Sequence, residues 1–204
     1  MSDGKYGDTE AHYSIEFFFF QKLIFDILLR TDGRTTDILE TVMDDQMTVR
    51  VLSQEQLREQ DIAANAGISG APFYKRESIL VSEKSNFVVS HNIALVCSKH
   101  VPAEMFEALS GREEGIGKTI SKLGLHTSRR LYEIGWKSAA EADDLFRKPF
   151  KPQFSRGSEK IPFKKYGLYF GTDPGIYMVE YFNPNMVRYR LERALKGKED
   201  AKNA

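Results

Sequence analysis

Residues 73–96 read FYKRESILVSEKSNFVVSHNIALV, and this stretch decides the class of fold. Two runs rich in apolar, β-branched and aromatic residues, 73–82 and 87–96, lie on either side of the polar turn at 83–86. Two such runs joined by a short polar turn predict a β-hairpin, and therefore antiparallel pairing.

Four further runs of the same kind predict strands at 46–52, 128–136, 163–170 and 175–182. The first of these alternates Met47, Val49 and Val51 with polar residues, which is typical of a half-buried strand. Strands that follow one another, with helices mostly at the two ends of the chain, predict an α+β fold. We expect a single domain built on an antiparallel β-sheet of about six strands with flanking helices.

Helices are expected at 14–29, from residue 35, at 103–109 and at 185–196. Ser53 and Gln56 form a capping-box pattern that predicts another short helix, ended by Gly67. In the first helix, five apolar residues recur at helical spacing and are expected to face the core: Phe17, Phe20, Ile24, Ile27 and Leu28.

The chain is expected to divide into a flexible N-terminal tail at 1–13, one domain at 14–196 and a disordered C-terminal tail at 197–204. Segment 110–125 is rich in glycine and charge, and a loop of this length usually covers something. Segment 137–162 contains Pro149 and Pro152 among many charges, which suggests an excursion or a mobile lid.

The charges of the 204 residues balance, with 29 lysines and arginines against 29 aspartates and glutamates. No global basic field is therefore available to hold nucleic acid, and neither the helix at 14–29 nor the short helix from residue 35 carries a basic, base-reading face. We expect no nucleic-acid partner, and any anion must be captured locally.

Cys97 is the only cysteine, which excludes an intramolecular disulfide and makes a cysteine-based metal site improbable. It lies in the apolar run 93–96, where a buried, inert thiol is expected. The N-terminal residues lack the pattern of a secretory signal, and the apolar segment 15–29 is interrupted by charges. These features predict a cytoplasmic protein without a membrane partner.

The stretch from Gly115 to Thr119 reads GIGKT, but its distance from Gly111 does not match a phosphate-binding loop. A flexible glycine turn is the expected structure, although glycines on both sides of Ile116 would let backbone amides approach an anionic ligand. The four histidines are scattered without metal-ligand spacing, so no metal is expected.

Two charges lie within apolar, strand-like runs, Arg76 in 73–80 and Glu180 in 176–182. Half of the residues on a strand face solvent, so an exposed surface position is the simplest interpretation of each charge. Composition and periodicity alone leave the function open.

The order of these segments resembles the chorismate pyruvate-lyase family and the related UTRA-like effector-binding domains of some bacterial transcription regulators. Four stretches within residues 23–187 carry the resemblance: LLRTDGRTT at 28–36, YKRESIL at 74–80, GIG at 115–117 and MVEYFNP at 178–184. The resemblance implies a ligand pocket with Arg76 and Glu180 as catalytic and substrate-binding residues. It also implies contacts to substrate from Arg34, Ile116 and Gly117, although the position of Arg34 is apolar in the better-known enzymes.

The activity implied is that of a carbon-oxygen lyase that eliminates pyruvate from chorismate and leaves the aromatic acid 4-hydroxybenzoate. This elimination needs neither a metal nor a redox cofactor, so no cofactor is expected. A planar guanidinium such as that of Arg76 can grip a carboxylate of chorismate through two hydrogen bonds. Glu180 is expected to donate a hydrogen bond or a proton, with a role as base or as an orienting group left open. The alternative function is a non-catalytic module of the same fold that binds a small effector.

Overall fold

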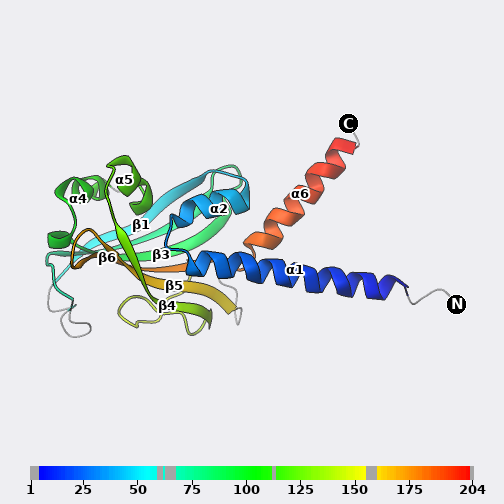
Figure 1. Cartoon of the computed structure of the whole chain (residues 1–204), viewed down its shortest axis with the longest axis horizontal. Helices are drawn as coiled ribbons and strands as arrows, with labels where there is room; N and C mark the ends of the chain where they lie inside the picture. The colour runs from blue at the N-terminus through cyan, green and yellow to red at the C-terminus, as the bar shows by residue number, and fades with distance from the viewer. Residues whose placement is uncertain (1–4, 59–61, 63–67, 112–113, 155–159, 203–204) are drawn as a thin grey trace.

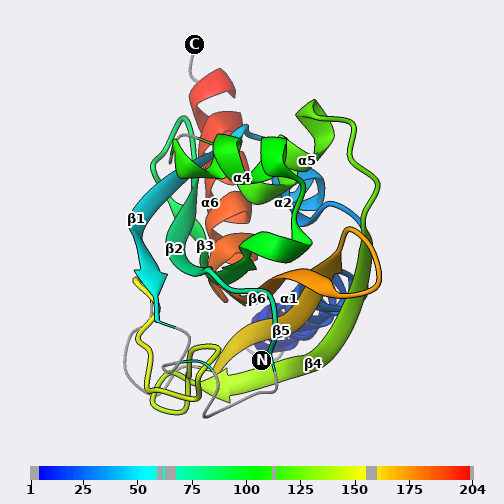
Figure 2. The same cartoon turned by 90° about the vertical axis from the view of Figure 1, so that its left-hand side faces the viewer.

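The computed structural model describes residues 5–58, 62, 68–111, 114–154 and 160–202. These residues form one six-stranded antiparallel sheet in the order β1-β2-β3-β6-β5-β4, with helices packed on it (Figures 1 and 2). The strands are β1 (Met47–Leu57), β2 (Phe73–Ser82), β3 (Val88–Cys97), β4 (Ser128–Ser138), β5 (Lys160–Tyr169) and β6 (Pro174–Phe182). The structure confirms the predicted single-domain α+β fold and the hairpin of β2 and β3.

Five α-helices lie among the described residues: α1 (Lys5–Arg30), α2 (Thr35–Met43), α4 (Ala103–Ser110), α5 (Ile116–Lys122) and α6 (Met186–Lys202). Helices α2, α4 and α5 lie over one face of the sheet (Figures 1 and 2). The C-terminal half of α1 packs Phe25 and Leu28 against Leu80 and Phe182 of the same face.

The strand registers align four polar residues in one row across the sheet. Ser78 of β2 is opposite Asn92 of β3, Asn92 is opposite Glu180 of β6, and Glu180 is opposite Lys164 of β5. Because directly paired residues point to the same side of a sheet, all four lie on the face that the helices cover.

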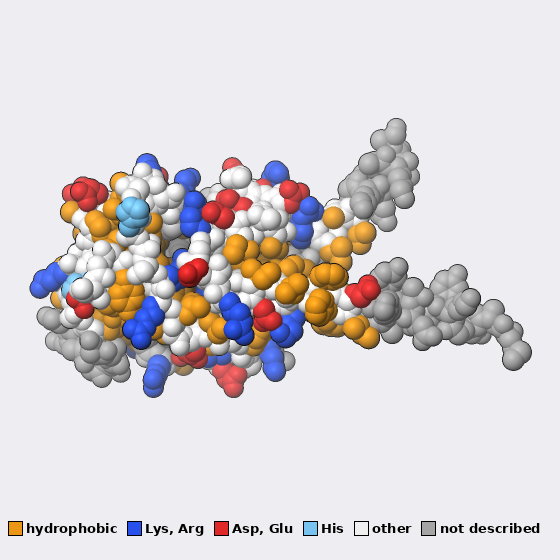
Figure 3. Space-filling model, viewed as in Figure 1, with side chains coloured by type: hydrophobic (Ala, Val, Ile, Leu, Met, Phe, Trp, Pro, Cys, Tyr) orange, Lys and Arg blue, Asp and Glu red, His pale blue; other side chains and the backbone are white. Residues whose placement is uncertain are grey.

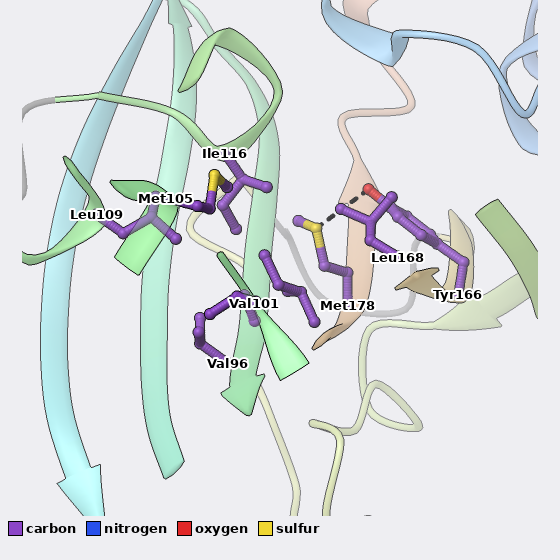
Figure 4. Packing of buried hydrophobic residues seen from close by; sticks show 10 residues of the cluster. Val96, Val101, Met105, Leu109, Ile116, Tyr166, Leu168 and Met178 are labelled. Atoms are coloured by element: carbon purple, nitrogen blue, oxygen red, sulfur yellow. Dashed lines mark hydrogen bonds between the residues drawn. The ribbon is translucent and has the colours of Figure 1, made fainter. Parts of the chain in front are cut away.

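An apolar cluster closes the sheet beside this polar row. Figure 4 shows Met105 and Leu109 of α4, Ile116 of α5 and Met178 of β6 among the labelled residues of this cluster. The Tyr166 hydroxyl donates a hydrogen bond to Met178 Sδ at 3.2 Å within it. This packing fixes where α5 lies relative to the sheet.

Part of segment 137–162 covers the opposite face of the sheet. Ala142 packs with Ile93, Phe163 and Tyr181 there, and the Tyr181 hydroxyl donates to Asp143 O at 2.7 Å. Since Ile93 and Tyr181 point away from the polar row, the described part of this segment is no lid over that row, contrary to one of the two interpretations above.

Both terminal helices are longer than predicted. Helix α1 begins at Lys5 instead of residue 14, and α6 continues to Lys202, through most of the expected tail at 197–204. Strong helix formers dominate residues 197–202 but not residues 5–13, and a single glycine in each segment, Gly7 and Gly197, costs only about 1 kcal/mol. The division into one domain with two tails remains a prediction.

The side of α1 that faces the core also differs from the prediction. Phe25, Leu28 and Leu29 are buried, whereas Phe20 and Ile27, which were expected in the core, are 57% and 50% exposed. The helix is apolar on more than one side, so periodicity could not determine which side would contact the sheet.

Two local predictions are wrong because tertiary contacts outweigh local signals. Strand β1 continues through Ser53 and Gln56 to Leu57, since it pairs with β2 as far as Phe73. Segment 110–125 contains the helix α5 instead of only a loop, because Ile116 is buried in the apolar cluster. Residues 59–61 and 63–67, including the predicted helix end at Gly67, lie outside the described residues.

The thiol of Cys97 is fully buried, and burial raises its pKa to about 12. A thiol with so high a pKa is a poor nucleophile at neutral pH, in agreement with the predicted inert role. No helix in the described part of the chain combines the length and apolar character needed to span a bilayer. Nor do the described residues include a group of three or more His, Cys, Asp or Glu side chains placed to hold a metal ion.

Candidate ligand-binding cavity

A cavity of about 330 Å³ lies between the helix-covered face of the sheet and helices α2 and α5. Its volume is at the lower end of the range for small-molecule sites, roughly 300–1,000 Å³. The polar and charged residues that line it include Arg34, Thr35, Glu40, Arg76, Ser78, Asn92, Glu114, Lys118, Arg129 and Glu180.

The floor of the cavity holds a buried ion pair. Lys164 Nζ lies 3.5 Å from Glu180 Oε2, and the Lys164 side chain is completely buried. Lys164 also donates to Thr35 Oγ1 at 2.8 Å and to Leu28 O at 3.0 Å. The Thr35 hydroxyl in turn donates to Glu180 Oε2 at 3.4 Å. The pair therefore joins the sheet to the end of α1 and the start of α2.

Burial dominates the electrostatics of this floor. It lowers the pKa of Lys164 from its ordinary value, and the neighbouring Arg129 lowers it further, while Glu180 opposes both effects. Burial also raises the pKa of Tyr166 well above its ordinary value, and the charge of Glu180 adds to the rise. Charges in this region are poorly solvated, so an added anion or cation would interact with them strongly.

Arg129 forms a wall of the cavity from β4. It donates hydrogen bonds to Gly33 O and, at 3.4 Å, to Thr35 Oγ1, and its guanidinium lies 4.4 Å from the centre of the Tyr166 ring. Its Nε atom is buried without a hydrogen-bond partner among the described residues. Asn92 Oδ1 is also buried and unpartnered, although Asn92 Nδ2 donates to Ser90 Oγ at 3.2 Å.

Arg76 is 2% exposed, which rules out the interpretation that it is a solvent-facing strand charge. Its guanidinium donates to Leu109 O at 2.9 Å, to Gln54 Oε1 at 3.2 Å and to Glu114 O. The side chain thus fixes the end of α4 and the start of the α5 segment while it lines the cavity.

Arg34 lies at the rim. It forms an ion pair with Asp37 at 3.1 Å and donates to Ser121 Oγ at 3.4 Å, which links α2 to α5. Its side chain is 49% exposed. Ile116 and Gly117 form the first turn of α5 after Gly115, and both line the cavity.

The structure brings together all the residues that the resemblance singled out. Arg34, Arg76, Ile116, Gly117 and Glu180 line the same cavity, although they come from four separate segments of the chain. Glu180 is 7% exposed, so it is not a surface charge either. What each residue does toward a ligand remains a prediction.

Sequence reasoning missed three polar residues of the site: Asn92, Arg129 and Lys164. Lys164 and Arg129 each stand next to a second cation, Lys165 or Arg130, and only one member of each pair can face the cavity. Alternation within a strand shows that the two cations of each pair point to opposite faces of the sheet. It does not show which of the two points to the face that the helices cover.

No protein-family model matches this chain, and no curated protein matches it either. PhnF from Mycobacterium smegmatis superposes with a TM-score of 0.51 at 12% identity, over 76% of this chain and 65% of the PhnF chain. SA0254 from Staphylococcus aureus has a TM-score of 0.49 at 10% identity, over 76% of this chain and 89% of its own. The effector binding domain of the B. subtilis trehalose repressor has a TM-score of 0.37 at 12% identity, over 67% of this chain and 90% of its own.

Of these three superpositions, only that with PhnF exceeds a TM-score of 0.5, and at 12% identity it shows a shared fold alone. This chain spans 65% of the length of PhnF. The fold is consistent with the UTRA-like fold to which the resemblance points, and it does not single out chorismate lyase.

Proposed function

We propose that this protein is a small-molecule binding domain whose cavity receives a small anionic ligand. The anionic group would accept a hydrogen bond from Arg129 Nε, and a hydroxyl group of the same ligand would donate one to Asn92 Oδ1. A buried polar atom without a partner costs about 1–3 kcal/mol, so native structures rarely leave one. Two such atoms on residues that line one cavity are the observation that carries the proposal.

The charges of the cavity favour an anion. Four cations line it, Arg34, Arg76, Lys118 and Arg129, against the three carboxylates of Glu40, Glu114 and Glu180. All three carboxylates are already engaged. Glu40 accepts the Met47 amide at 3.1 Å, Glu114 pairs with Lys122 at 2.8 Å, and Glu180 pairs with Lys164.

Binding without chemistry is the simpler function for these contacts. The Glu180 carboxylate accepts a hydrogen bond from Thr35 and pairs with Lys164, an arrangement that suits an acceptor more than a proton donor. The likeness in fold to the proteins above agrees with a binding role and does not carry it.

A chorismate pyruvate-lyase is the second candidate. The observation that favours it is the presence of Arg76, Arg129 and Glu180 around one cavity, where two guanidinium groups can meet a substrate with two carboxylates. The elimination yields an aromatic ring, so the protein needs to add only positioning, charge stabilisation and proton transfer.

The two functions are distinguished by one set of measurements on the purified chain. Calorimetric titration with 4-hydroxybenzoate and with its neutral amide should show binding of the acid and much weaker binding of the amide. Incubation with chorismate should release no pyruvate if the protein is a binding domain, whereas stoichiometric pyruvate and 4-hydroxybenzoate would establish the lyase.

Arg129→Gln should weaken binding of the acid by roughly 10- to 100-fold, because a charged hydrogen bond contributes about 1.5–3 kcal/mol. Arg130→Gln is the matched control, since Arg130 is exposed and is the next residue on the same strand. Equal affinity for acid and amide, or equal effects of the two substitutions, would contradict an anion site at Arg129.

A further inference from the structure

The described part of α1 carries an exposed apolar stripe in addition to its buried one. Ile15, Phe19, Leu23 and Ile27 follow one another at intervals of four residues and are between 44% and 68% exposed. Residues four apart lie on one side of a helix, so these four form a continuous strip. Figure 3 shows the apolar side chains gathered over α1 and the base of α6.

We propose that two copies of this chain associate through this surface, with α1 of each copy packed against α6 of the other. Phe18 and Phe20 of α1 and Leu191 and Leu195 of α6 extend the surface, and each is 46% or more exposed.

The size of the surface fits a dimer. Phenylalanine side chains bury 150–250 Å² each, so the exposed parts of Phe18, Phe19 and Phe20 alone offer roughly 300–450 Å². The half-exposed leucines and isoleucines bring the surface to roughly 700–800 Å², close to the ~800 Å² per partner of a stable interface and above the largest patch of most monomers.

The charges of the two helices favour a second copy of the chain as the partner. The described side chains of α1 include the carboxylates of Glu16 and Asp26. Residues 186–196 of α6 carry four basic residues and one glutamate, a net charge of +3. Within one chain the helices meet at their base, where Gln21 Nε2 donates to Pro184 O at 2.7 Å, and then diverge (Figure 1).

A two-fold axis uses this complementarity twice, because each contact between α1 and α6 recurs with the copies exchanged. A lipid surface is a poorer partner. Membrane-bound amphipathic helices carry lysine and arginine along their polar side, whereas Glu16, Lys22, Asp26 and Arg30 of α1 balance in charge.

Sedimentation equilibrium of the full chain tests the proposal. We expect a mass of twice 23.3 kDa that falls to the single-chain mass on dilution, with weaker association at high salt. The double substitution Phe19→Glu, Leu23→Glu should raise the dimer dissociation constant about 100-fold or more, as for residues at the centre of an interface. Leu52→Glu is the control, because Leu52 is 41% exposed on β1, away from both helices, and should leave the constant unchanged.

Arg193→Glu on α6 provides a second variant that leaves the apolar stripe intact, and it should weaken the dimer about 10-fold. Circular dichroism of each variant verifies that it is folded. A wild-type chain that stays at the single-chain mass at every concentration would overturn the proposal. So would a dimer whose dissociation constant changes neither with Phe19→Glu, Leu23→Glu nor with Arg193→Glu. Monomeric chain that instead sediments with phosphatidylcholine–phosphatidylglycerol vesicles would also overturn it and assign the surface to lipid.

Discussion

Replacing Lys164 by methionine removes the buried cation beneath the cavity while keeping most of its apolar volume. The substitution leaves the Glu180 carboxylate, only 7% exposed, without the ammonium group 3.5 Å away. It also removes the hydrogen bonds that Lys164 donates to Thr35 and to Leu28 O. Removing one member of a buried pair leaves the other charge buried without a partner, which lowers the free energy of unfolding by about 3–5 kcal/mol.

Glu180→Gln should cost much less, about 1 kcal/mol, because the amide can still accept the Thr35 hydrogen bond. Burial already lowers the pKa of Lys164, so this lysine can lose its proton when its partner is gone. In the double variant no charge is stranded, and we expect a total cost of about 2 kcal/mol. The sum of the stability losses of the two single variants then exceeds the loss of the double variant by about 2 kcal/mol or more. This difference is the coupling energy of the pair.

Urea unfolding of the wild type, the two single variants and the double variant measures this cycle. At a slope of about 2 kcal/mol per molar urea, a loss of 3 kcal/mol lowers the midpoint by about 1.5 M. Lys165→Met is the matched control. Lys165 points to the opposite face, and its partner Asp143 keeps Lys137 at 2.7 Å, so the cost should stay below about 1 kcal/mol. Equal costs for Lys164→Met and Lys165→Met, or a coupling energy near zero, would refute the reasoning.

Arg76→Ala should destabilise the fold by about 2–4 kcal/mol and weaken acid binding, because it leaves Leu109 O and Glu114 O without their hydrogen-bond donor. Arg76→Lys should recover part of both losses, and an unchanged thermal unfolding temperature of Arg76→Ala would contradict this prediction. Glu180→Gln should tighten binding of an anion roughly 10-fold by calorimetry if the cavity only binds, and should instead slow single-turnover pyruvate release from chorismate if it is a lyase. Burial lowers the pKa of His91, whereas the unfolded chain takes up the proton near pH 6.5, so His91 should make stability fall as the pH drops below about 6.5. Urea midpoints measured across this range should depend less on pH in His91→Gln.

The contacts of His91 explain the direction of its shift beyond burial alone. Its Nδ1 accepts a hydrogen bond from the Gln153 amide at 3.1 Å, and its Nε2 lies 3.0 Å from Glu77 Oε1. A second proton would have to bind Nδ1, where it would face the backbone N–H of Gln153. The neutral ring with its proton on Nε2 satisfies both partners, and Glu77 offsets only part of the cost of burying a charged ring.

Most of the fold could be predicted from the sequence, because strand signals are local. The hairpin around residues 83–86 and the four other strands follow from alternation and turn chemistry. The extension of β1 to Leu57 and the helix α5 could not be predicted, since each depends on a partner distant in the sequence. Strand β2 overrides the capping pattern at Ser53, and the apolar cluster around Met178 holds Ile116 in place.

The candidate site could be predicted only in part. The resemblance pointed to Arg76 and Glu180, which do line one cavity. Neither composition nor periodicity could have separated these two from exposed strand charges, because burial depends on which face the helices cover. Asn92 carries no signal of its own, since one asparagine in an apolar strand is compatible with either face.

Lys164 shows most directly why the missing part was out of reach. Its neighbour Lys165 has the same chemistry, and only the register of β5 against β6 determines which lysine meets Glu180. On β4 the register shifts between Leu131 and Glu133, so counting alternate residues along that strand from Arg129 also fails. A one-residue slip would exchange the two faces and place Lys165 under the cavity. The buried charge pair is therefore a property of the pairing of strands, and the Lys164 and Lys165 variants compared above test that pairing as directly as they test the site.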